Sequence, residues 1–253
     1  MKQDLEISII MPAYNAEKFI SQAINSVINQ SYDKWELIVI DDCSKDDTAQ
    51  IIREYELQDK RIRRIVNEEN LGASKTRNKG VSLAHYDWVA FLDCDDMWER
   101  EKLEKQVLLL ESDSTAELIF TGSAFMNHNG EKKEHILQVP SKVSYEELLK
   151  QNIISCSSVM IKKKYLLMYT MPGDEMHEDF SVWLRVLKEI PCAHGINEPL
   201  LIYRLSENSK SSNKVKAAMM TYRVYKFVGL NWFQRMYYMF FYAYRSLKKY
   251  SNL

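Results

Sequence analysis

The chain has 253 residues, of which 46% are hydrophobic and 27% charged, and its formal net charge is −1. This length and composition fit one globular domain of generous size, or one domain with an appendage. The four cysteines lie far apart without a CxxC pair, which argues against a disulfide framework or a zinc site and suits a reducing compartment. No charged-then-apolar leader precedes the first strand-like run, so we expect a cytoplasmic protein.

The first half of the chain alternates strand-like and helix-like segments. A continuous apolar run predicts a buried strand over residues 7–13. Further strands are predicted over residues 35–40, 88–92 and 117–125, and a weaker one over residues 62–67. Apolar residues at helical spacing predict helices over residues 19–28, 48–55 and 73–84, and another that begins near Glu101. This alternation implies an α/β fold in which helices flank a mostly parallel central sheet.

The second half is less regular. Strand-like runs cover residues 135–140, 157–163 and 199–204. Ser144 and Glu147 have the spacing of a capping box, which predicts a short helix over residues 144–151. A further helix is indicated by an apolar stripe that follows the segment MPGDEMHED: Phe180, Trp183, Leu184 and Leu187.

Three strand ends in the first half carry groups that suit a ligand site. In α/β sheets of this kind, ligands gather beyond the carboxyl ends of the parallel strands. The groups are Pro12-Ala13-Tyr14, Asp41-Asp42, and the acids from Asp93 to Asp96. We expect them to share one site.

Asp93-Cys94-Asp95 is a DxD motif that directly follows an apolar strand. Two carboxylates one residue apart at a turn can face a hard divalent cation, Mg²⁺ or Mn²⁺, which takes its other ligands from water and substrate phosphates. The alternative is a solvated acidic turn that caps the helix beginning near Glu101. The buried strand before the motif and the second acid pair at Asp41-Asp42 favour the metal.

Several other polar groups each leave two interpretations open. Asp42 could accept a hydrogen bond from a base N–H, which uracil and guanine offer, or it could form an Asx turn. Glu178-Asp179 could be stabilised by the dipole at a helix start, or one of the two could be a general base. Arg77 and Arg204 are candidates for contacts with a diphosphate or for surface salt bridges. The absence of GxGxxG and GxxxxGK[ST] argues against a dinucleotide oxidoreductase and a P-loop NTPase.

The end of the chain has a different charge from the rest. Nine of the 34 lysines and arginines follow Glu207, and none of the 35 acidic residues does. Residues 1–207 therefore contain 25 basic and 35 acidic residues, which gives a net charge of −10. Residues 226–250 are rich in aromatic side chains at helical spacing but are too short and polar to span a bilayer. We expect this helix to lie on an anionic membrane surface. The alternatives are packing against the domain and a homodimer face.

Five segments in this order and spacing resemble glycosyltransferase family 2. They are ISIIMPAYN with the following VIDDCSKDDT, then NLGASKTRNKG, VAFLDCDDMW, HEDFSVWLRV and YRLSENSKSS, and the match covers about residues 6–212. Members of this family are inverting enzymes with the GT-A fold. The tail more loosely resembles the C-terminal helices of bacterial surface-polysaccharide members.

The resemblance implies roles for individual residues. The nucleoside would be held by Pro12, Ala13, Tyr14 and Asp42, with Asp42 facing the base. Asp93 falls where the ribose and the metal region are contacted, and Asp95 falls where Mn²⁺ or Mg²⁺ is bound.

Asp179 falls at the position of the catalytic base. Arg77 and Arg204 match basic positions near the substrate. Two positions depart from the family pattern, because many members have Gly where this chain has Cys43 and His where it has Ser206.

The implied reaction moves a sugar from a nucleotide-diphospho-sugar, with UDP as the expected nucleotide, to a saccharide or lipid-linked saccharide acceptor. We expect a catalytic domain over residues 1–212, divided near residue 125 into nucleotide-binding and acceptor halves, and a basic aromatic tail over residues 213–253. The expected location is cytoplasmic, on the inner face of the cytoplasmic membrane, in surface-polysaccharide synthesis, with no nucleic-acid partner. Two rival hypotheses are a nucleotidyltransferase, which would release pyrophosphate, and a non-catalytic protein that binds sugar nucleotides.

Overall fold

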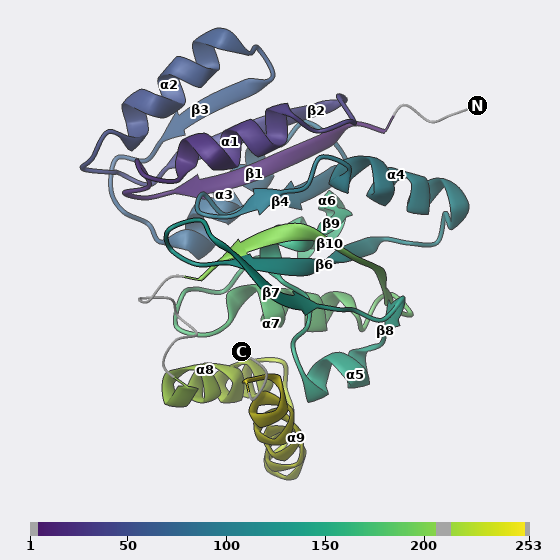
Figure 1. The fold of residues 1–253 in the computed structure, drawn as a ribbon. Coiled ribbons are helices and arrows are strands. Elements are labelled where there is room, and N and C mark those ends of the chain that lie inside the picture. Colours follow the sequence, from purple (N-terminus) through teal and green to yellow (C-terminus); the bar gives the residue numbers. More distant parts are fainter. Residues whose placement is uncertain (1–4, 206–213, 251–253) are drawn as a thin grey trace.

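The computed structural model describes residues 5–205 and 214–250, and its centre is a ten-stranded sheet (Figure 1). The strand order is β3-β2-β1-β4-β9-β6-β10-β5, with β7 paired to β6 and β8 paired to β10. Six strands share one direction: β1 (Ile7–Ala13), β2 (Trp35–Asp41), β3 (Ile62–Val66), β4 (Trp88–Phe91), β6 (Leu118–Met126) and β10 (Ala193–Arg204). The other four run against their neighbours: β5 (Met97–Trp98), β7 (Lys132–Leu137), β8 (Lys142–Val143) and β9 (Met160–Lys162).

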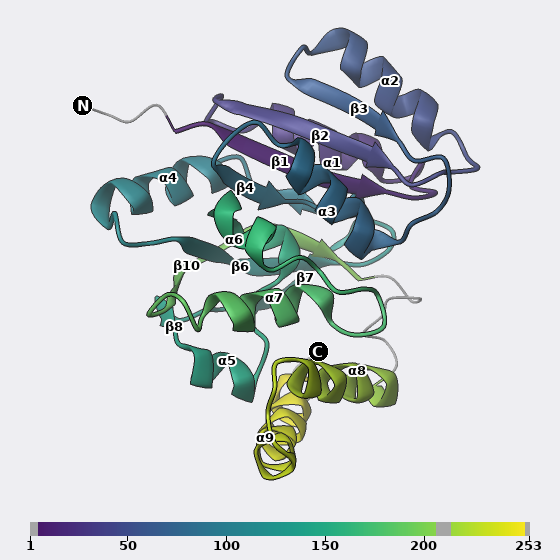
Figure 2. The ribbon, with the colours of Figure 1, turned by 180° about the vertical axis from the view of Figure 1, so that it is seen from behind.

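Helices cover both faces of the sheet, as Figures 1 and 2 show from opposite sides. One face packs against α1 (Ile20–Ile28), α2 (Thr48–Gln58) and α4 (Lys102–Ser112). The other packs against α3 (Ala73–Leu83), α5 (Tyr145–Lys150), α6 (Lys163–Met168) and α7 (Glu178–Val186). The predicted α/β fold is therefore confirmed.

Strand β1 shows why the two faces form separate cores. Successive side chains of a strand point to opposite faces, so Ile9 lies in the core under α1 whereas Ile10 lies in the core under α3. On the α3 side, a Cβ atom at Gly80 would lie 2.4 Å from Cγ2 of Ile10, so the helix approaches the sheet this closely only because Gly80 has no side chain. Each fully buried isoleucine contributes about 1.5–3 kcal/mol to folding.

The sequence predictions differ from the structure mainly in the second half. The capping box is present, since Ser144 Oγ accepts from the Glu147 amide and Glu147 accepts from the Ser144 amide. Strand β10 begins six residues before the predicted start, with register irregularities on both sides of Pro199 that conceal it in the sequence. Strands β5 and β8 have two residues each and are too short to give a periodic signal.

The tail forms two helices, α8 (Lys214–Phe227) and α9 (Trp232–Tyr250), where the sequence predicted one. Helix α8 packs on the domain, because Val224 and Tyr225 are fully buried in the core that α7 shares. The Tyr225 hydroxyl donates a hydrogen bond of 2.6 Å to the Leu149 carbonyl. Within residues 5–205 and 214–250, no helix is long and apolar enough to cross a membrane. Ser206 lies outside the described residues.

Candidate active site

The predicted nucleoside-binding residues meet at the carboxyl edge of the sheet. Ala13 and Asp41 are register partners at the ends of β1 and β2, and the Asp42 amide donates a 2.8 Å hydrogen bond to the Ala13 carbonyl. Pro12 is buried, whereas Tyr14, with 48% of its surface exposed, presents its ring to solvent. The structure therefore brings Pro12, Ala13, Tyr14 and Asp42 together, as the sequence predicted.

Asp42 holds the loop between β3 and α3. Its buried carboxylate accepts hydrogen bonds from Asn67 Nδ2 (2.7 Å) and from the amides of Leu71 (2.9 Å) and Gly72 (2.8 Å). A carboxylate offers about four acceptor positions, so one position, on Oδ2, is left for a base N–H. Recognition of the base by Asp42 stays a prediction, and the structure adds a second role in fixing this loop.

The loop before α3 is joined to the loop before α7. Gly72 has φ +82°, and a Cβ atom there would lie 2.2 Å from Oδ2 of Asp174. Oδ1 of Asp174 accepts from both the amide (3.1 Å) and the hydroxyl (2.8 Å) of Ser74. The nucleoside side of the site is thereby attached to the segment that leads to Glu178 and Asp179.

Arg77 is buried on α3 and bridges two acids from distant parts of the chain. Its Nη2 lies 2.5 Å from Oδ1 of Asp93, and its Nη1 lies 2.9 Å from Oε1 of Glu178. The guanidinium thus fixes the DxD turn against the start of α7. Contact between Arg77 and a diphosphate stays a prediction, because both of its terminal nitrogens are directed at these acids.

Arg204 holds the DxD turn from the other side. Its Nε donates to the Asp95 carbonyl (2.9 Å), and its amide donates to Oδ1 of Asp96 (3.0 Å). Its Nη2 donates to Oε1 of Gln22 (2.7 Å), and the guanidinium lies 4.5 Å from the centre of the Phe19 ring. The side chain is buried, so Arg204 supports the turn directly, and its predicted contact with a diphosphate is not tested by this arrangement.

Burial and neighbouring negative charge disfavour the ionised forms of Asp95 and Asp96. Burial and the negative charge of Asp93 raise the pKa of Asp95 to about 6. Burial and the negative charges of Asp95 and Asp93 raise the pKa of Asp96 well above its usual range. Oδ2 of Asp96 has no hydrogen-bond partner among the described residues. A divalent cation beside Asp95 would be attracted by the field that penalises the carboxylate.

The donor set of the turn fits such a cation, although the protein supplies few ligands. Among residues 5–205 and 214–250, no group of three or more His, Cys, Asp or Glu side chains is placed to hold a metal. Mg²⁺ and Mn²⁺ accept this arrangement, because they keep water and bind substrate phosphates alongside one or two carboxylates. Asp95, with Asp93 beside it, is the residue that would hold the metal.

The two acids at the start of α7 have different environments. Glu178 is buried and paired with Arg77. Burial and the negative charge of Glu178 raise the pKa of Asp179 to about 7, and its Oδ1 accepts from the Phe180 amide at 2.7 Å. A general base works best with a pKa near the operating pH. This difference favours Asp179 over Glu178 as the base.

Tyr203 on β10 is partly buried and directly precedes Arg204. Its pKa is raised by burial first and then by the negative charges of four carboxylates: Asp96, Asp95, Asp93 and Asp179. Tyr203 is therefore a further candidate site residue. The sequence analysis missed Tyr203 as a site residue, although it precedes Arg204 in the quoted YR motif.

Three other site residues were also missed. Asn67 follows a weak strand, Asp174 lies in an irregular segment, and Glu178 was noted only beside Asp179. Each acts by holding another residue in place, and such a partner leaves no spacing signal in the sequence.

Arg77 and Asp174 thus join the carboxyl edge of the sheet, the DxD turn and the start of α7 into one region of the fold. The family model described as Glycosyl transferase family 2 matches residues 8–166. The chain belongs to this family and is an enzyme of the glycosyltransferase class.

Two relatives match over most of their length. TuaG of Bacillus subtilis, a glycosyltransferase named for teichuronic acid biosynthesis, is 42% identical over 220 residues, which cover 87% of each chain. WfgD of Escherichia coli is described as a UDP-Glc:alpha-D-GlcNAc-diphosphoundecaprenol beta-1,3-glucosyltransferase. It is 34% identical over 253 residues, covering 98% of this chain and 96% of WfgD.

Solved structures confirm the predicted GT-A fold. TarS 1–349 from S. aureus in complex with UDP-GlcNAc has a TM-score of 0.73 at 19% identity and covers 93% of this chain and 70% of its own. The mannosyltransferase PcManGT from Pyrobaculum calidifontis, in complex with GDP-Man and Mn²⁺, has a TM-score of 0.68 at 17% identity over 87% of this chain. This chain spans 63% of PcManGT and 41% of a longer TarS chain.

Proposed function

We propose that this glycosyltransferase moves a sugar from a UDP-sugar to a saccharide hydroxyl and inverts the anomeric configuration. The observation that carries the proposal is the Arg77 bridge, which holds the DxD turn against the helix that bears Asp179. UDP as the nucleotide is supported by the description of WfgD and by the UDP-GlcNAc complex of TarS. An N–H of uracil also suits the acceptor position left on Asp42.

The reaction is a single displacement. Asp179 takes the proton of the acceptor hydroxyl, and that oxygen attacks the anomeric carbon from the face opposite the diphosphate. The bond from this carbon to the diphosphate oxygen breaks, and UDP leaves with the bonding electrons. Mn²⁺ or Mg²⁺ at Asp95 would supply positive charge to the departing diphosphate. Arg77 and Arg204 orient the turn and the base, and alignment of the two substrates contributes much of the acceleration.

We further propose that the acceptor is a saccharide linked through a diphosphate to a lipid, as the description of WfgD indicates for that relative. The reaction would take place on the cytoplasmic side of the membrane, in surface-polysaccharide synthesis. The division into a catalytic domain (1–212) and a tail (213–253) belongs to this proposal. Helix α8, the first helix of the tail, is attached to the catalytic domain because Val224 and Tyr225 pack in the core of that domain.

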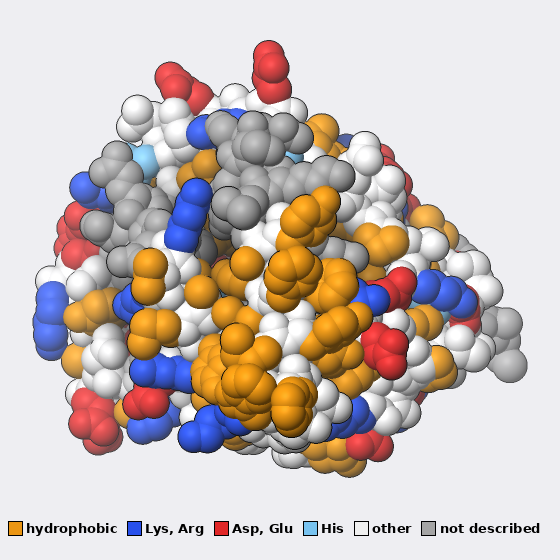
Figure 3. Space-filling model, turned by 90° about the horizontal axis from the view of Figure 1, so that it is seen from below, with side chains coloured by type: hydrophobic (Ala, Val, Ile, Leu, Met, Phe, Trp, Pro, Cys, Tyr) orange, Lys and Arg blue, Asp and Glu red, His pale blue; other side chains and the backbone are white. Residues whose placement is uncertain are grey.

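The exposed face of α9 suits a membrane surface. Four large apolar side chains that recur at helical spacing on α9 are exposed, with Phe233 at 78% and Phe240 at 69% the most open, and the other two are Met236 and Tyr244. Figure 3 shows hydrophobic side chains gathered on this face, with lysine and arginine side chains beside them. Aromatic and basic residues without acids favour an interface with anionic lipids. A symmetric dimer through the same face would oppose like charges, since no acid follows Glu207.

Thermal unfolding with UDP-, GDP- and dTDP-sugars, with and without Mn²⁺, tests the donor. We expect UDP-sugars with Mn²⁺ to give the largest rise in Tm, and proton NMR of the product to show inversion. Release of pyrophosphate from a nucleoside triphosphate would instead support a nucleotidyltransferase. Binding of UDP-sugar without transfer or slow hydrolysis would support a non-catalytic protein.

Flotation with vesicles tests the membrane surface. Vesicles that contain phosphatidylglycerol should carry the protein, and purely phosphatidylcholine vesicles should carry much less. Phe233→Glu should reduce flotation, whereas Leu57→Glu, at an exposed position on α2, should not. A concentration-dependent dimer that Phe233→Glu dissolves, with no flotation of the wild type, would favour a homodimer face.

A further inference from the structure

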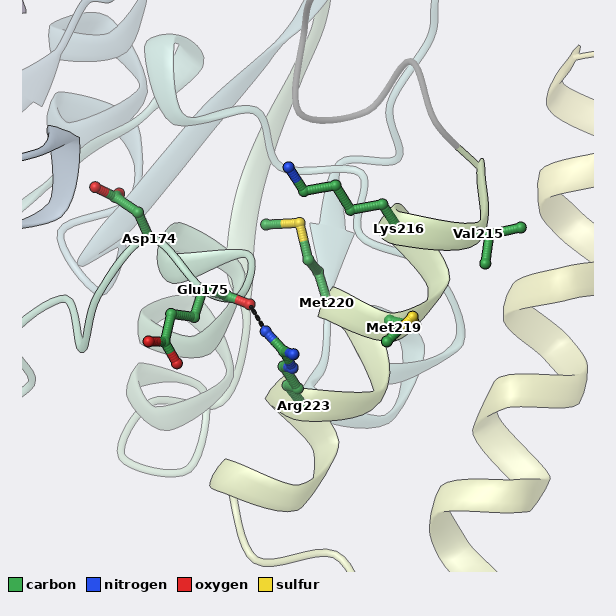
Figure 4. Close-up of a pocket in the computed structure, with 7 residues that line it drawn as sticks. All are labelled: Asp174, Glu175, Val215, Lys216, Met219, Met220 and Arg223. Carbon is green, nitrogen blue, oxygen red and sulfur yellow. Dashed lines mark hydrogen bonds between the residues drawn. The ribbon is translucent and has the colours of Figure 1, made fainter.

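A cavity of about 490 Å³ lies between α8 and the loop that leads into α7 (Figure 4). The loop contributes Asp174 and Glu175, and α8 contributes Val215, Lys216, Met219 and Arg223. Met220, at the base of the cavity, is buried. None of these side chains belongs to the donor site described above except Asp174, which bonds to Ser74.

The two walls of this cavity differ in charge. Figure 4 shows the carboxylates of Asp174 and Glu175 turned away from α8, while Lys216 and Arg223 extend from α8 toward the loop. Nη1 of Arg223 donates a 2.8 Å hydrogen bond to the backbone carbonyl of Glu175, which joins the two walls of the cavity. The α8 wall is therefore cationic and apolar.

This combination suits a phosphate ester of an apolar alcohol. Lysine and arginine bind phosphate oxygens through charge-assisted hydrogen bonds. Val215, 70% exposed, and Met219, 55% exposed, continue the cavity into open apolar surface on the tail. A neutral sugar alone would gain little from two cations, and a nucleotide would find no aromatic ring to stack on among the lining residues.

The cavity lies at the approach to the proposed base. Glu175 precedes Asp179 by four residues, so their Cα atoms are within about 14 Å of each other. His177, between them, places Nε2 3.2 Å from the Ala217 carbonyl of α8, which fixes the helix beside the start of α7. A sugar whose diphosphate occupied the cavity could therefore extend its free hydroxyl toward Asp179.

We propose that this cavity is the acceptor subsite for the diphosphate of a lipid-linked saccharide, with the lipid leaving over Val215 and Met219 toward the exposed face of α9. The inference rests on the proposed function, because it assumes transfer to a saccharide. It adds Lys216 and Arg223 as the residues that bind the acceptor, and their charge-assisted hydrogen bonds to the diphosphate as the reason for the selectivity.

Two acceptors with the same sugar test the proposal: the undecyl diphosphate ester of N-acetylglucosamine, and its undecyl glycoside, which lacks the diphosphate. Lys216→Gln and Arg223→Gln should each raise the KM for the diphosphate acceptor about tenfold, the effect of losing one charge-assisted contact. Neither should change the KM for the glycoside or the slow hydrolysis of UDP-sugar. Lys60→Gln, an exposed lysine beside β3, is the matched control and should change nothing.

A second experiment does not depend on Lys216 or Arg223. Lengthening the alkyl chain of the diphosphate acceptor should lower the KM of the wild type, and Met219→Gln should weaken this trend. Tm values of all variants within a few degrees of the wild type would show that the loop before α7 is intact.

Each outcome decides the proposal. An equal rise in KM for both acceptors would mean that Lys216 and Arg223 act only on the shape of the loop, and would overturn it. Wild-type enzyme that uses both acceptors equally well would overturn the subsite and leave the proposed function standing. Wild-type enzyme that binds UDP-sugar and transfers to neither acceptor would overturn the proposed function as well.

Discussion

Replacing Asp179 with Asn removes the proposed base and keeps the shape of the side chain. The amide oxygen of Asn can still accept from the Phe180 amide, as Oδ1 of Asp179 does at 2.7 Å. The neighbouring Arg77–Glu178 pair is untouched. The substitution therefore changes proton transfer with little change in the geometry of the site.

Two magnitudes follow from this structure. Loss of a positioned base lowers kcat by about 10²–10⁴-fold, which is about 3–5 kcal/mol of activation free energy. The rise of the pKa from 3.8 to about 7 also costs the ionised wild type folding free energy, at most about 4 kcal/mol. Asp179→Asn avoids this cost, so the variant should be the more stable protein at high pH.

The stability of the wild type relative to Asp179→Asn should change with pH in one direction. Below about pH 4 the folded and unfolded wild-type chains both hold this proton, so the wild type and Asp179→Asn should differ little in stability. Between about pH 4 and pH 7 only the folded chain holds it, so the stability of the wild type falls as pH rises. The Tm difference between variant and wild type should therefore grow across this window and level off above it.

The assay is single-turnover transfer from UDP-sugar, with UDP binding measured by calorimetry and Tm measured from pH 4 to pH 8. Wild-type kcat/KM should fall about tenfold per pH unit below pH 7, where Asp179 becomes protonated. A variant that binds UDP and keeps wild-type kcat would refute the assignment of the base. A Tm difference that does not vary with pH would refute the account of its pKa.

Three further outcomes are expected. Asp95→Asn should abolish the Mn²⁺-dependent part of UDP binding in calorimetry and leave the metal-free part. The control Asp33→Asn, at an exposed position, should leave both parts unchanged. UDP binding by Asp95→Asn that keeps its dependence on Mn²⁺ would show that Asp95 is not the metal ligand. Arg77→Met removes the cation that bridges Asp93 and Glu178, and should lower the free energy of unfolding in urea by about 3–5 kcal/mol, against about 0.5 kcal/mol or less for the exposed Arg53→Met. Cys43 has φ +65°, so Cys43→Gly should stabilise the chain by about 0.5–1 kcal/mol, while Cys43→Ala, which keeps a Cβ atom, should bring no such gain.

Strands and helices with strong periodic patterns could be predicted from the sequence. Strand β1 was predicted with its observed bounds, because the continuous apolar run of a strand buried on both faces ends at Tyr14. Strand β7 lies three residues earlier than predicted, and its exposed, charged sequence gives no alternation to fix it. Helix α8 was missed because its buried side depends on packing against α7 and α5.

The predictable part of the site is limited in the same way. Asp42, Asp95 and Asp179 could be singled out because they occur at the ends or starts of predicted elements, and their roles stay predictions. The partners of Arg77 could not, because Asp93 and Glu178 are 85 residues apart and meet only in the folded chain. The left-handed backbone at Cys43 agrees with the glycine that many family members have there.

The connection between α8 and α9 has a practical consequence. Val228 is the last buried residue of the domain core in this region, and Gly229 follows it with φ +87°. Helix α8 before this glycine places Val224 and Tyr225 in the hydrophobic core, whereas most side chains of α9 after it are exposed. Under the proposed membrane role of α9, a chimera that exchanges only the segment after Gly229 should change the surface that the enzyme binds and keep its activity. A truncation before Tyr225 should instead yield insoluble protein.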